Sequence, residues 1–75
     1  MKVKISEELC DRIVSAASHG RYLGMGWAVT DAEGQLLPPS TPLRPGMFIG
    51  AENYYGYVVL RVNDDMSLTE CEKED

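Results

Sequence analysis

The sequence predicts a single α+β domain in which one N-terminal helix packs on a small antiparallel sheet of four to five short strands. Two observations predict this class. Residues 6–19 carry apolar side chains at helical spacing, whereas from residue 25 onward short apolar segments alternate with turn residues. One helix against one face of a small curled sheet lets both elements bury their apolar sides. At 75 residues the chain has room for one modest core.

The helix has a clear start signal and an apolar stripe. Ser6 is a good N-cap, and Glu7 and Glu8 place negative charge in the first turn, where it suits the helix dipole. The stripe comprises Leu9, Cys10, Ile13, Val14 and Ala17. Gly20 is suited to ending the helix in the left-handed conformation. We therefore expect a helix over about residues 6–19, preceded at residues 3–5 by a short edge strand or a simple lead-in.

The strands follow from turn chemistry. The Asp-Ala-Glu-Gly segment at residues 31–34 predicts a type I turn with a bulge inside a hairpin over about residues 25–37. All four prolines lie in residues 38–45, which predicts an extended connector outside the sheet. Part of it also fits the Pro-x-x-Pro-x-Arg pattern of peptide ligands, although this pattern is frequent by chance. Strands are expected over about residues 47–71, followed by an acidic tail at 72–75. The strongest strand has Val58, Leu60 and Val62 on one side and Tyr57, Val59 and Arg61 on the other.

Composition bears on the compartment. No apolar run approaches the roughly 20 residues that span a bilayer, and the basic start lacks the apolar stretch of a signal peptide. We therefore expect a cytoplasmic protein that does not associate with membranes. In a reducing cytoplasm Cys10 and Cys71 are expected to be free and partly buried, and a disulfide between them is the open alternative.

Acidic residues form the first candidate binding feature. The net charge is −5, and half of the 12 acidic residues lie in the last 14 positions. Such a surface disfavours direct nucleic-acid binding and is attracted to a basic protein instead. The candidate contacts are Asp64, Asp65, Glu70, Glu72 and Glu74, whose spacing could imitate a phosphate backbone. The alternative is a solvated tail that keeps the protein soluble.

Aromatic residues form the second candidate. Tyr54, Tyr55 and Tyr57 lie close together in the sequence, and Trp27 is expected to lie nearby in the sheet. Tyrosine and tryptophan combine a large apolar area with a polar group and are common at interface hot spots. The alternative is that these side chains line the sheet or cover its core.

The sequence offers no catalytic constellation. His19 is expected at an exposed helix end, and Cys10 lies on the apolar stripe, where a reactive thiolate is disfavoured. Catalysis would require a nucleophile with a base, a carboxylate pair, or a metal or cofactor. We therefore expect no enzyme, no cofactor and no metal site.

These observations lead to one main hypothesis about function. We expect a small non-enzymatic protein-binding module that regulates or inhibits a larger, basic or nucleic-acid-handling protein complex, as inhibitors from mobile elements do. Its partner would be a heterologous protein, and a homo-oligomer remains open. The alternative is a small structural or accessory subunit of an assembly such as a phage particle, and a small enzyme is the third class. The sequence does not identify the partner, the organism or the oligomeric state.

Overall fold

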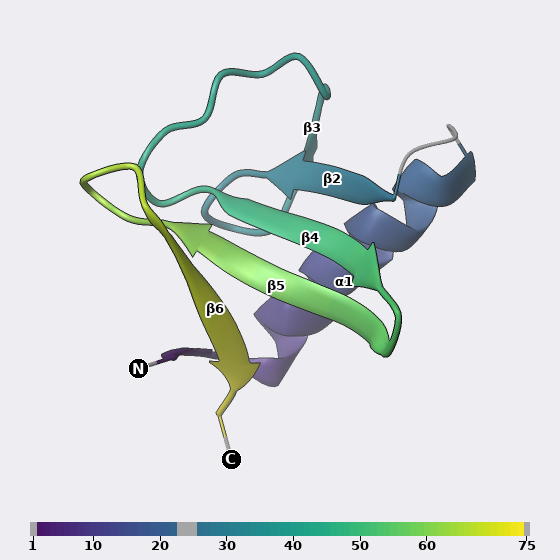
Figure 1. Ribbon diagram of the computed structural model, residues 1–75, viewed down its shortest axis with the longest axis horizontal. Coiled ribbons are helices and arrows are strands. Elements are labelled where there is room, and N and C mark those ends of the chain that lie inside the picture. Colours follow the sequence, from purple (N-terminus) through teal and green to yellow (C-terminus); the bar gives the residue numbers. More distant parts are fainter. Residues whose placement is uncertain (1, 23–25, 75) are drawn as a thin grey trace.

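The computed structural model describes residues 2–22 and 26–74, in which one helix packs on an open six-stranded sheet (Figure 1). The α+β arrangement predicted from the sequence is confirmed. The predicted sheet of four to five antiparallel strands is wrong, because the sheet has six strands and is mixed. In chain order the elements are β1 (Val3–Ile5), α1 (Glu7–Tyr22), β2 (Trp27–Thr30), β3 (Leu36–Leu37), β4 (Phe48–Asn53), β5 (Gly56–Val62) and β6 (Leu68–Lys73).

The strand β1 makes the sheet mixed. The spatial order is β1-β6-β5-β4-β2-β3, and β1 runs parallel to β6, with Val3 opposite Cys71 and Ile5 opposite Lys73. The backbone N–H of Glu74 continues this pairing by donating to the carbonyl of Ile5 at 2.8 Å. Residues 72 and 73, predicted as part of an acidic tail, therefore belong to β6. Residue 75 lies outside the described residues.

The helix begins as predicted and ends later. The Ser6 hydroxyl accepts a hydrogen bond from the N–H of Leu9 at 3.1 Å, which is the expected N-cap. The helix then continues through Gly20 to Tyr22, so the predicted end at residue 19 is wrong. Gly20 is buried inside the helix rather than placed at its end. The burial of Gly20 offsets its weak helix propensity.

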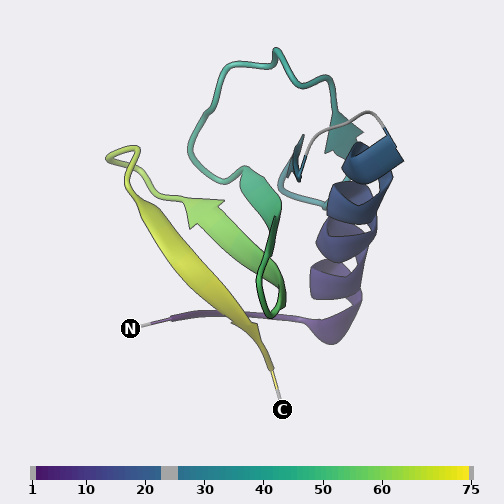
Figure 2. The same cartoon turned by 45° about the vertical axis from the view of Figure 1, so that its right-hand side comes forward.

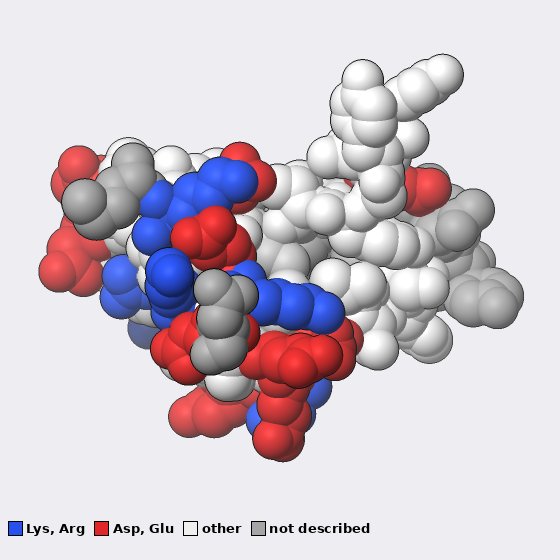
Figure 3. All heavy atoms as spheres, turned by 90° about the horizontal axis from the view of Figure 1, so that it is seen from below, with Lys and Arg blue, Asp and Glu red and all other residues white. Residues whose placement is uncertain are grey.

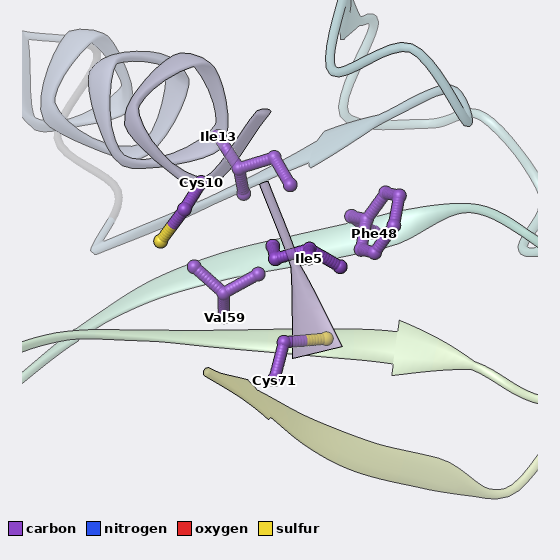
Figure 4. Packing of buried hydrophobic residues seen from close by; sticks show 6 residues of the cluster. All are labelled: Ile5, Cys10, Ile13, Phe48, Val59 and Cys71. Carbon is purple, nitrogen blue, oxygen red and sulfur yellow. The ribbon is translucent and has the colours of Figure 1, made fainter. Parts of the chain in front are cut away.

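The core lies between α1 and the sheet. Its main cluster joins the helix to β1, β4, β5 and β6 through Ile5, Cys10, Ile13, Phe48, Val59 and Cys71 (Figure 4). The helix comes very close to β4 at Gly50, where an added Cβ would lie 2.9 Å from the carbonyl oxygen of Ile13. A residue with a Cβ atom does not fit at this position without a shift of the helix or the strand. Gly50 therefore sets the distance between α1 and the sheet.

Two connections complete the fold. In the β2–β3 hairpin, Gly34 has a φ of +83° and its N–H donates to Asp31 at 3.1 Å, as the bulged turn requires. Residue 25, the predicted first residue of this hairpin, lies outside the described residues. The connector at residues 38–45 is not extended throughout, because the N–H of Thr41 donates to the carbonyl of Pro38 at 2.9 Å and closes a turn. This turn interrupts the polyproline geometry that the Pro-x-x-Pro-x-Arg pattern would need. Figure 2 shows the connector arching over one end of the sheet while α1 lies along the other side.

Candidate interaction surface

The sheet has one face sealed by the helix and one open face. Strand register places Trp27, Ala51 and Val58 side by side on the face opposite α1. The next row across the strands is likewise apolar until it reaches β6, and it consists of Leu37, Val29, Ile49, Leu60 and Glu70. We call the outward side chains of these two rows, together with Val62 and Leu68, the open face.

The open face is only partly covered by the described chain. Val29 and Val62 are buried in a second cluster with Met47, at the end where the connector passes. Toward the middle and the margins, Ile49, Ala51, Val58 and Leu60 are half-buried, Trp27 is 38% exposed and Leu68 is 47% exposed. In a sheet with helices on one side only, outward positions are usually polar. Here the outward positions are apolar, and the sequence alone did not predict which residues would form this apolar face.

Tyr54 and Tyr55 lie at the tip of the β4–β5 hairpin. They are 95% and 94% exposed, and their rings meet edge to face with centroids 5.4 Å apart. The turn that presents them is closed by Asn53, whose side-chain oxygen accepts the N–H of Tyr55 at 2.9 Å, and by Gly56 at a φ of +130°. The two rings therefore have almost their whole surface available to a partner.

The four aromatic candidates do not form one cluster. Tyr57 pairs in register with Glu52 and lies on the helix side of the sheet, half-buried. Trp27 lies on the open face at the start of β2. It also borders a hollow of about 280 Å³ whose walls include Gly20, Leu37, Pro38 and Pro39. Of the aromatic candidates, Trp27 thus belongs to the open face, and Tyr54 and Tyr55 belong to the hairpin tip.

The acidic candidates separate into two groups at opposite ends of β6. Asp64 and Asp65 lie in the β5–β6 turn, where Asp65 accepts the N–H of Ser67 at 3.0 Å. Hydrogen bonds from Ser67 lower the pKa of Asp65, so this carboxylate stabilises the turn. The other group, Glu70, Glu72 and Glu74, lies along and just beyond the far half of β6.

Lysines of the N-terminal segment accompany this second group. Lys2 Nζ lies 3.4 Å from Glu70 Oε1, and Lys4 is the register partner of Glu72 across the parallel pair. The margin of the open face along β1 and β6 therefore carries alternating charges rather than a continuous acidic row. Sequence reasoning missed this because no local signal indicates that β1 pairs with β6.

Charge is unevenly distributed over the molecule. In the view of Figure 3, charged side chains gather over the half where β1 and β6 run, and the other half is mostly uncharged. Further acidic residues accompany the helix, where Asp11 pairs with Lys73 at 3.1 Å and Glu8 pairs with Arg12. Hydrogen bonding to Asp11 raises the pKa of Lys73. The uncharged half contains the hairpin tip and the start of β2.

The two thiols lie in the core and not on this surface. Cys10 and Cys71 are free and buried. Burial raises the pKa of both thiols, although Lys73 partly offsets the effect at Cys10 and Arg61 does so at Cys71. In Figure 4 the two sulfur atoms do not point toward each other. Both cysteines therefore act as small apolar core residues.

Two further findings complete the description. Within residues 2–22 and 26–74, no three His, Cys, Asp or Glu side chains are grouped so that they could hold a metal ion. In the same part of the chain, no helix is both long enough and apolar enough to cross a bilayer.

Comparisons with known protein families, with curated proteins and with solved structures find no significant match.

Proposed function

We propose that the protein is a small non-enzymatic protein-binding module whose contact surface is the open face of its sheet. One observation carries this proposal: the outward positions of β4 and β5 are apolar although the described chain leaves them partly uncovered. Large apolar patches on a small domain mark interaction sites. The exposed rings of Tyr54 and Tyr55 extend the surface at one end, where aromatic side chains serve as interface anchors.

Within this class we propose a regulator or inhibitor of a larger, basic or nucleic-acid-handling complex. The net charge of −5 supports the choice, because it favours encounter with a basic protein and disfavours contact with phosphates. Because Glu70 pairs with Lys2 and Glu72 lies in register with Lys4, we propose that steering by the acidic residues, with Asp64, Asp65 and Glu74 included, contributes less than apolar contact. The cytoplasm is the proposed compartment.

A second candidate is a small structural or accessory subunit of an assembly, such as a phage particle. The same apolar open face favours it, because permanent interfaces are more apolar than transient ones. The two roles differ in partner: a regulator binds a heterologous protein, whereas a structural subunit binds copies of itself or fixed neighbours.

The test is capture of partners from source-cell lysate on tagged protein, with and without nuclease, followed by mass spectrometry. Leu68 and Leu36 provide a matched pair, since both are strand leucines that are 47% exposed but lie on opposite faces of the sheet. We expect Leu68→Gln to lose a nuclease-resistant protein that the wild type and Leu36→Gln retain. Equal capture by all three proteins would contradict the open face as the contact surface.

The aromatic and acidic contributions separate in a second series. Replacing Tyr54 or Tyr55 with alanine should cost about 2 kcal/mol of binding free energy if one ring is a hot spot. Replacing Glu70, Glu72 and Glu74 together with glutamine should weaken binding mainly at low salt if electrostatic steering dominates.

A further inference from the structure

The central strand β5 has the composition of a strand that is buried on both faces. Its residues Val58, Val59 and Leu60 are apolar in succession, and neighbouring residues in a strand point to opposite faces. Such continuous apolar runs are typical of strands with a layer on each side. Val59 is buried beneath α1, whereas Val58 and Leu60 face outward and stay half-buried. The helix thus covers one face of β5, although the strand has apolar side chains on both faces.

We propose that the second layer is another copy of the chain, packed sheet to sheet, so that two open faces meet between two outer helices. This inference rests on the contact surface of the proposed function and takes up its second candidate role, in which the chain binds copies of itself. Two-fold symmetry would place the same surface on both copies, which is the most common way for identical subunits to associate.

The dimensions of the open face suit this partner. The molecule measures 31 × 27 × 21 Å, and the sheet fills much of the broad side seen in Figure 1. A specific interface needs roughly 800 Å² from each partner, which a face of this size can provide. Within the first row, Ala51 is the smallest side chain and lies between Trp27 and Val58. It leaves room for a side chain of the facing sheet, and facing sheets pack by such interdigitation.

The charge of this face is also compatible with a second copy. Among the described residues of the open face itself, the one charged residue is Glu70, which pairs with Lys2. Lys4 and Glu72 lie in register at its margin, and Glu74 lies just beyond β6. The face therefore carries little of the net charge of −5 of the whole chain. Two copies that meet here therefore bring little negative charge together.

The test is sedimentation equilibrium of the purified chain over about a thousand-fold range of concentration, because self-association depends on concentration. Wild type, Leu68→Gln and Leu36→Gln are compared, and circular dichroism confirms that each variant is folded. We expect the wild type and Leu36→Gln to dimerise with equal dissociation constants. Because each dimer contains the substitution twice, Leu68→Gln should raise the dissociation constant about 30-fold.

Other outcomes overturn the inference in distinguishable ways. A wild type that stays monomeric over the whole range overturns it, and capture of another protein that Leu68→Gln alone loses would leave the proposed function standing. A dimer that Leu68→Gln leaves unchanged places the interface elsewhere and also overturns it. If Leu68→Gln also captures the same proteins from lysate as the wild type, the open face is contradicted as the contact surface.

Discussion

Replacing Gly50 with alanine tests how closely the helix packs on the sheet. The added Cβ would lie 2.9 Å from the Ile13 carbonyl oxygen, and 3.1 Å from both the Ala17 Cβ and the Ile13 Cγ2. These are backbone or short, rigid groups, so α1 and β4 must move apart by several tenths of an ångström. Overpacking of this kind costs about 2 kcal/mol, which lowers the melting temperature of so small a domain by roughly 8–16 °C.

Gly26 provides the matched control, because no described atom lies within 4 Å of a Cβ added there. Urea unfolding monitored by the fluorescence of Trp27, the one tryptophan of the chain, gives the free energy of unfolding of each variant. We expect Gly26→Ala to be as stable as the wild type or slightly more stable. A Gly50→Ala variant with wild-type stability would refute the close packing of the two layers.

Three further predictions concern individual side chains. Met66 is 48% exposed and has a φ of +70°, so Met66→Asn should raise the free energy of unfolding by about 1 kcal/mol in urea titrations, and a decrease would contradict the strained turn. The pKa of Asp65 is lowered in the folded state, so its contribution to stability is present above its ordinary pKa of about 3.9 and is lost as pH falls through the folded value. The destabilisation caused by Asp65→Ala should therefore shrink in acid, and a constant difference from pH 7 to pH 2 would count against it. The pKa values of Cys10 and Cys71 are raised in the folded state, so their contribution is present below the ordinary value of about 8.5 and is lost as pH rises through the folded values. Native protein should accordingly react with a thiol reagent at pH 8 far more slowly than protein in urea, and equal rates would contradict the burial.

Local signals were sufficient for much of the fold. Ser6 followed by Glu7 and Glu8 predicted where the helix begins, and the turn before Gly34 predicted the first hairpin, because both depend on interactions within a few residues. Gly20 misled the prediction of the helix end. Its local preference for ending a helix was overridden by its burial in the fold, which no neighbouring residue indicates.

The mixed sheet was missed because its cause is distant in the sequence. Val3 pairs with Cys71 across nearly the whole chain, and a parallel pair has no hairpin turn to mark it. The unpredicted pairing of β1 with β6 also affected the interpretation of the acidic candidate residues. Without this pairing, Glu70 and Glu72 suggested an acidic row, whereas Lys2 and Lys4 lie beside them.

Which face of β5 the helix would cover was also beyond the sequence. The alternation of Val58 and Leu60 against Val59 was evident, yet both sides are apolar, so the pattern alone does not select the inner one. The packing of Val59 beneath α1 makes that choice, and it leaves Val58 and Leu60 on the open face.

The central claim, that a protein layer covers the open face, is tested most directly by the environment of Trp27. This side chain is 38% exposed on that face, so covering it should shift its fluorescence to shorter wavelength and protect it from acrylamide quenching. Over a dilution series we predict that both signals revert to the exposed state at the concentration where the dimer dissociates, and that Leu68→Gln moves this midpoint upward. Signals that stay constant while the dimer forms would show that the open face remains uncovered and would contradict the account.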